Sequence, residues 1–162
     1  MNAGNRIPNG PACKPISCIC SLILLCWLCI FSGIVQALDN PDAPDYVGEF
    51  NKRAQAYEQD IQQTAQTTQD YLAAYVAYEH FLDKELNHIY RQLIAQLNGE
   101  TRDALRVSQR KWLQYRDAAF EFIALNWTME SFGSASVISR GDYRTTIIRD
   151  RVLLLLNYQQ NY

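Results

Sequence analysis

The chain has 162 residues, of which 48% are hydrophobic and 20% are charged, with 15 Lys and Arg against 17 Asp and Glu. This length accommodates one domain and at most an appendage, and seven Gly and five Pro exclude a collagen-like or a Pro/Gly-rich low-complexity chain. The formal net charge of −2 argues against a nucleic-acid binder, because such proteins usually carry a basic excess on one face.

The first 37 residues have the three parts of a secretory signal. Residues 1–15 hold two basic groups and no acid, and the run 16–31 is almost wholly apolar. Val35 and Ala37 then stand at positions −3 and −1 of a cleavage site, so we predict a signal peptide at 1–37. The apolar stretch is also long enough to remain as an N-terminal membrane anchor. Lipidation is disfavoured, because neither Cys26 nor Cys29 follows a small residue.

All five Cys lie inside this predicted signal, at positions 13, 18, 20, 26 and 29. Cleavage after Ala37 would leave residues 38–162, which hold 13 Lys and Arg, 17 Asp and Glu, and no Cys. The exported domain, periplasmic or secreted, would then carry a net charge of −4 and fold without disulfides in a compartment that permits them.

The exported part is predicted to be helical throughout. Residues 38–45 form a polar, Pro-containing leader, and 46–97 read as helix, with a Gln- and Thr-rich stretch at 59–69 that is either the solvated part of one helix or a break between two. Steps of three and four define the helical seam Leu72, Tyr75, Glu79, Leu82, Leu86, Ile89 and Leu93. Asn98-Gly99 is expected to end this helix, because Gly tolerates a positive φ.

A third helix is expected after this turn, with Thr101 as its cap. Its seam is predicted at Leu105, Ser108, Trp112, Tyr115, Ala119, Phe122 and Asn126. A turn at 131–136 and a last helix at 144–158 follow, while 137–143 carries no clear pattern. No long run alternates with period two, so the sequence predicts an all-α fold: a three- or four-helix antiparallel bundle over 46–162, preceded by a cleavable signal peptide.

Motifs for catalysis, metals and cofactors are absent from the exported sequence. It has no Cys, no Gly-x-Ser-x-Gly elbow and no Gly-rich phosphate loop. Glu85 and His88 form a single Glu-x-x-His pair, whereas di-iron bundles need two such pairs. Arg102, Arg106 and Arg110 make a basic helical stripe that suits either an anionic ligand or, as we favour, a solvated face. We therefore expect a non-enzyme without metal or cofactor.

Four stretches together form a recognisable pattern: Asp83–Leu93, Ser108–Ala118 with its Gln-x-x-Trp-x-x-Tyr-Arg-Asp pattern, Gly133-Ser134, and Thr146-x-x-Arg149. Through this pattern, residues 82–156 resemble the LprI-like family (lysozyme inhibitor LprI, N-terminal region), whose members are small secreted or envelope helical domains. The resemblance implies a protein-binding domain that inhibits lysozyme-type muramidases, and a net charge of −4 would favour a strongly basic partner.

The sequence departs from the family pattern at two points. Many members carry a Cys where this chain has Phe120 and another near 141–143, so the resemblance implies that the family disulfide is absent here. The first Gly of a family Gly-Gly-Ser is Phe132, which puts a family-like turn in doubt. Burial of Phe120 would offset part of the loss.

The candidate binding residues are Gln109, Trp112, Arg116, Asp117, Gly133, Ser134, Arg140, Asp142 and Arg149. Gln109, Trp112 and Arg116 share one helical face, and Arg116 and Arg149 are expected to reach Asp117, Asp83 or Glu79, which favours a structural role over binding. The segment 132–143, with its Arg-Gly-Asp tripeptide, is expected to be an exposed inhibitory loop.

An envelope adaptor or an immunity-like accessory protein is the alternative function. Its docking face would be the Tyr-rich set Tyr57, Tyr71, Tyr75 and Tyr78. Either function implies a protein partner and no nucleic acid, with membrane contact only if the N-terminal segment stays uncleaved.

Overall fold

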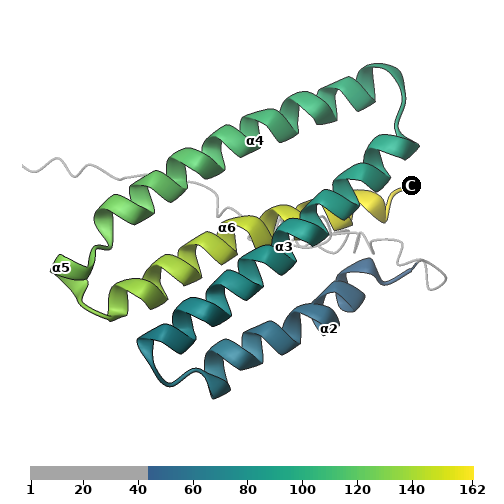
Figure 1. Cartoon of the computed structure of the whole chain (residues 1–162). Coiled ribbons are helices and arrows are strands. Elements are labelled where there is room, and N and C mark those ends of the chain that lie inside the picture. The colour runs from purple at the N-terminus through teal and green to yellow at the C-terminus, as the bar shows by residue number, and fades with distance from the viewer. Residues whose placement is uncertain (1–43) are drawn as a thin grey trace, which may run out of the picture. The chain divides into compact units, whose positions relative to one another are not determined.

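The computed structural model describes residues 44–162, which form helices and no strands (Figure 1). The elements are α2 (Tyr46–Gln59), the π-helical turn η1 (Asp60–Thr64), α3 (Thr68–Gln96), α4 (Gly99–Asn126), the short α5 (Met129–Phe132) and α6 (Ala135–Gln159). The all-α bundle is thereby confirmed. The predicted signal at 1–37 and most of the leader lie outside the described residues.

The Gln- and Thr-rich stretch is a break between two helices. Helix α2, capped by Asp45, runs into η1, and Ala65 and Thr67 are extended. A capping box then starts α3: Thr67 Oγ1 accepts from the Asp70 N–H (3.2 Å), and Asp70 Oδ2 accepts from the Thr67 N–H (2.9 Å). The chain reverses here, so that α2 lies against α3.

The core lies where α2, α3 and α6 meet. Helix α3 supplies Leu82, Leu86, Ile89 and Leu93, each at most 3% exposed. They pack with fully buried residues of the two neighbouring helices, namely Phe50, Ala54, Val152 and Leu155. Each of these side chains except the methyl group of Ala54 contributes about 1.5–3 kcal/mol of transfer free energy. The α3 seam is thus confirmed from Tyr75 to Leu93, but its first member, Leu72, is 46% exposed.

The seam predicted for α4 is wrong in phase. Its expected members Tyr115 and Phe122 are 59% and 60% exposed. The face toward the bundle instead carries buried or half-buried side chains at Leu105, Gln109, Trp112, Arg116, Phe120 and Ile123. Helix α4 therefore has two apolar faces, of which one packs on the core.

Two expected boundaries are also wrong. Helix α4 begins at Gly99, so Thr101 lies inside it and caps nothing, although Gly99 has the positive φ (+51°) expected of the turn. Helix α6 begins at Ala135, which makes most of the expected loop 132–143 helical. Among residues 44–162, no helix combines the length and apolar character needed to cross a membrane.

Candidate functional site

Gln109 anchors α4 to α6 through a buried arginine. Its Oε1 accepts hydrogen bonds from Arg151 Nε (3.1 Å) and Nη2 (3.0 Å), and Arg151 Nη2 also donates to Ser108 Oγ (3.2 Å). Gln109 and Arg151 are each 7% exposed, and burial lowers the pKa of Arg151. Gln109 thus links α4 to α6 through Arg151, a partner that the sequence did not suggest.

Trp112 and Arg116 extend this anchor along α4. The guanidinium groups of Arg116 and Arg151 lie 5.6 and 5.7 Å from the centre of the Trp112 ring system. Arg116 pairs with Asp117 (2.7 Å) and lies 3.8 Å from Asp83 of α3, as expected. These contacts tie α4 to both α3 and α6, and Arg116, Trp112 and Asp117 lie together.

Arg149 reaches a different helix from the one expected. It donates to Asn51 Oδ1 (2.9 Å) and pairs with Glu58 (3.3 Å), both on α2, while Glu79 pairs with Arg144 (2.8 Å). Glu58 also accepts from the Tyr78 hydroxyl (2.8 Å), and Asp142 accepts from the Tyr75 hydroxyl. Burial, followed by the hydrogen bonds to these carboxylates, raises the pKa of both tyrosines.

The tyrosine docking face is therefore wrong. Tyr75 and Tyr78 are each 4% exposed, and Tyr57 stacks on Phe81 with ring centroids 4.6 Å apart. Tyr71 is half-buried. Tyr75 and Tyr78 thus lie between the helices and stabilise the bundle, and Tyr57 and Tyr71 expose only part of their rings, so the four do not form an exposed docking face.

Residues 128–136 form a protruding corner that we call the tip, at the left end of Figure 1. Thr128 caps α5 by accepting from the Ser131 N–H (3.2 Å), and Gly133 then turns the chain with φ +56° and ψ −145°, a region essentially restricted to Gly. Ser136 is fully buried, and its hydroxyl donates to the Gly133 carbonyl (2.7 Å). The tip is held in one conformation by these bonds.

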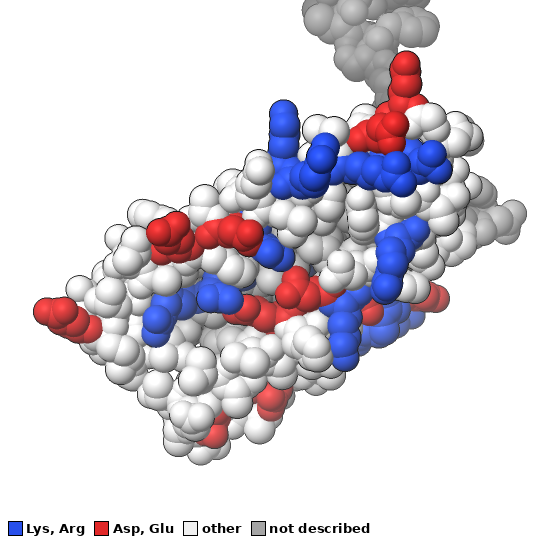
Figure 2. Space-filling model, turned by 45° about the horizontal axis from the view of Figure 1, so that its top comes forward, with Lys and Arg blue, Asp and Glu red and all other residues white. Residues whose placement is uncertain are grey.

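The outer surface of the tip is apolar. Met129 and Phe132 are 55% and 48% exposed, and Leu125 of α4 is 72% exposed. Behind them, Trp127 packs on Tyr143 of α6 with ring centroids 4.5 Å apart. In Figure 2 this left end is white except for an acidic side chain at its extremity, whereas charges of both signs are more frequent over the rest of the visible face.

The remaining candidates divide between the tip and α6. Gly133 and Ser134 form the turn of the tip, where Gly133 supplies the special backbone conformation. Arg140 donates to the Ser136 carbonyl (3.2 Å), and Asp142 faces Tyr75, so the Arg-Gly-Asp tripeptide lies within a helix. The nine candidates are thus spread over three places rather than gathered in one site.

The single Glu-x-x-His pair does not form part of a metal-binding cluster. Glu85 pairs with Arg53 of α2 (2.7 Å), which raises the pKa of Arg53. Among residues 44–162 no group of three or more His, Cys, Asp or Glu side chains is placed to hold a metal ion. In the basic stripe, Arg106 pairs with Asp103 (2.9 Å), as a solvated face does.

A family model described as lysozyme inhibitor LprI matches residues 59–155, more than half of the chain. The chain belongs to the LprI family. No curated protein and no solved structure matches it. The LprI match begins at the last residue of α2. The fully buried Phe50 and Ala54 therefore belong to the core but lie outside the matched region.

Proposed function

We propose that this chain is an exported, non-catalytic protein-binding domain that inhibits a lysozyme-type muramidase. The observation that carries the proposal is the family match over 59–155, because the family is described as a lysozyme inhibitor. Export rests on the signal pattern of residues 1–37. A net charge of −4 on residues 38–162 would speed encounter with a strongly basic muramidase.

The tip has a shape suited to insertion into the active-site cleft of a muramidase. A glycosidase acts in a cleft that holds two carboxyl groups, and a convex, rigid element can block it at little cost in entropy. The tip is convex, is fixed by Gly133 and Ser136, and exposes Met129 and Phe132. Exposed aromatic and Met side chains are typical anchors of protein interfaces.

A lysis assay with residues 38–162 tests the proposal. This fragment keeps the whole hydrophobic core, whose buried members run from Phe50 to Leu156. We expect stoichiometric inhibition of muramidase-driven lysis of peptidoglycan or cells. Inhibition should fall at least tenfold in Phe132→Ala and stay unchanged in Leu154→Ala, a similarly exposed apolar residue (39%) outside the tip.

Absence of inhibition by the wild-type fragment at stoichiometric excess would refute the muramidase function. Inhibition that survives Phe132→Ala together with Met129→Ala would leave that function intact and refute the tip as its binding element. Export is tested separately, by following a C-terminal tag into the periplasm or medium and sequencing the mature N-terminus, which we expect at Leu38.

The alternative function is that of an envelope adaptor or an immunity-like accessory protein. The exposed outer face of α4 favours it, because Tyr115 and Phe122 add to the apolar surface at Leu125. Cross-linking from Phe122 in envelope extract would distinguish the two, since an adaptor should capture a protein other than a muramidase. Replacement of Tyr115 by Ser, on the same outer face but farther from the tip, should weaken that capture without affecting lysis inhibition.

A further inference from the structure

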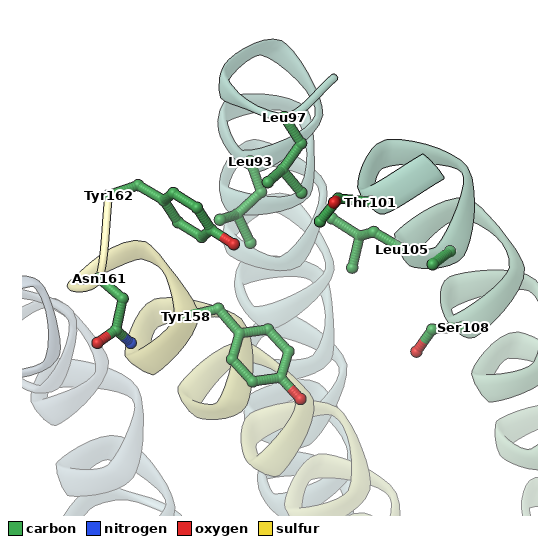
Figure 3. A pocket seen from close by; sticks show the side chains of 9 residues that line it. Leu93, Leu97, Thr101, Leu105, Ser108, Tyr158, Asn161 and Tyr162 are labelled. Atoms are coloured by element: carbon green, nitrogen blue, oxygen red, sulfur yellow. The ribbon is translucent and has the colours of Figure 1, made fainter. Parts of the chain in front are cut away.

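An apolar pocket lies at the opposite end of the molecule from the tip, beside the turn between α3 and α4. Its volume is about 360 Å³. It is lined by Leu93, Leu97, Thr101, Ala104, Leu105, Ser108, Tyr158, Asn161 and Tyr162. In Figure 3 the Tyr162 ring lies beside Leu93 and Leu97, and Tyr158 reaches from α6 toward α4. Three helices thus contribute walls, and pockets of this size accept small molecules.

The inner wall of this pocket belongs to the core. Leu93 is 1% exposed and Leu105 is 9% exposed, and both are members of the main hydrophobic cluster. A ligand that lies along these side chains would extend the core, so it needs an apolar chain.

A buried positive charge lies behind one polar wall of the pocket. Arg151 donates to Gln109 and to Ser108, which are neutral, and no carboxylate of residues 44–162 lies within 4.0 Å of its guanidinium. At 7% exposure, this charge is largely shielded from solvent and has no counter-ion among residues 44–162. Nη1 donates to no protein group among the described residues.

Ser108 connects the charge to the pocket. Its Oγ accepts from Arg151 Nη2 (3.2 Å), so its own hydrogen remains free to donate to a ligand, and Ser108 lines the pocket. Tyr158, another lining residue, can donate a second hydrogen bond. A ligand anion would therefore meet hydroxyl donors that face it from two helices, with the Arg151 charge directly behind.

We propose that this pocket binds a single-chain anionic amphiphile, with its chain along Leu93, Leu97 and Leu105 and its carboxylate at Ser108, toward Arg151. This site is separate from the tip and independent of muramidase inhibition. Charge complementarity selects the ligand class, because the apolar wall binds the chain while the uncompensated guanidinium favours an anionic head over a neutral one.

Calorimetric titration of residues 38–162 with decanoate and with decanol tests this proposal. We expect saturable binding of decanoate at one site, and binding of decanol that is about tenfold weaker or more, since a hydrogen bond to a charged group is lost. Ser108→Ala should weaken decanoate binding and leave decanol binding unchanged. No saturable decanoate binding, or equal binding of decanol, would overturn the proposal.

A pair of matched substitutions on α4 locates the site. Ala104→Trp places a large side chain in the pocket, whereas Ala118→Trp places it on an exposed position outside the pocket. Both positions are exposed, so both variants should keep the helical circular dichroism spectrum and the cooperative unfolding of the wild type. We expect decanoate binding to fall at least tenfold in Ala104→Trp alone. Equal binding by the two variants would place the ligand elsewhere and refute the pocket.

Discussion

Gly141 is predicted to be the least replaceable glycine of the described chain. It is buried on α6, where an added Cβ would overlap three atoms of the Tyr75 ring. Tyr75 is 4% exposed and its hydroxyl donates to Asp142. The ring therefore cannot move aside without leaving its hydrogen bond and its place between α3 and α6.

The expected cost of Gly141→Ala follows from these contacts. Overpacking costs about 1–3 kcal/mol. Loss of the Tyr75–Asp142 hydrogen bond adds about 1.5–3 kcal/mol, because its acceptor is a carboxylate. Higher helix propensity returns about 0.5–1 kcal/mol. We expect a net loss of about 2–4 kcal/mol, and a fall in Tm of roughly 10 °C for a domain of this size.

Urea unfolding followed by circular dichroism measures this loss as a lower midpoint at constant m-value. The Tyr75→Ala background is the matched control: without the ring, Gly141→Ala should be neutral or stabilising by up to about 1 kcal/mol. If Gly141→Ala stabilised the otherwise unchanged protein by that amount, the close approach of α6 to Tyr75 would be refuted.

Three further predictions concern pH and the tip. Hydrogen bonds with the Thr67 side chain, and then with the backbone, lower the pKa of Asp70. Asp70 therefore contributes to the free energy of unfolding above the unfolded pKa of about 3.9, and this contribution is lost as pH falls through the folded pKa. Asp70→Asn should flatten the acid limb of a stability–pH curve. The pKa values of Tyr75 and Tyr78 are raised, so both tyrosines contribute to the free energy of unfolding below about pH 10, and this contribution is lost as pH rises through the folded pKa values. A titration followed by tyrosinate absorbance should show two tyrosines that ionise only on unfolding. Gly133→Ala should cost about 1–3 kcal/mol in thermal unfolding, because Ala is strained at φ +56° and ψ −145°, and should weaken inhibition through the displaced tip.

The buried face of α3 could be predicted from the sequence, and the buried face of α4 could not. Helix α3 has α2 and α6 as neighbours, so its apolar side chains follow a single dominant seam from Tyr75 to Leu93. Helix α4 carries apolar residues on two faces: Leu105 and Ile123 are buried, while Phe122 and Leu125 are exposed. Periodicity detects both faces equally, and only the positions of α3 and α6 decide which one is buried.

The segment 132–143 differs from the predicted loop for another reason. Its Gly and Ser residues are typical of loops, which made a loop the natural prediction. In the structure only Gly133 serves a turn; Gly141 gives room for the Tyr75 ring, and Ser136 is buried as a donor to the Gly133 carbonyl. A glycine needed for close packing cannot be told from a turn glycine without the neighbouring helix.

Phe120 stands where the family resemblance implies a cysteine, and it links α4 to α6 without a disulfide. The Arg144 guanidinium lies 4.3 Å from the Phe120 ring centre, and Arg144 pairs with Glu79 of α3. A cation–π contact of this kind contributes about 0.5–2 kcal/mol, against roughly 2–4 kcal/mol for a disulfide. Phe120 therefore replaces only part of a disulfide, and other contacts must supply the rest.

The buried Gln109–Arg151 contact supplies such an attachment between α4 and α6. Leu105, Gln109 and Ile123 are the buried residues of α4, and the hydrogen bonds of Gln109 to Arg151 add to the packing of the half-buried Trp112 and Phe120. The tip joins the end of α4 to the start of α6. Gln109 thus fixes α4 to α6 at the pocket end, away from the tip, whose own bonds run through Thr128, Gly133 and Ser136: Gln109→Ala should lower the urea midpoint of unfolding and leave inhibition through Met129 and Phe132 unchanged.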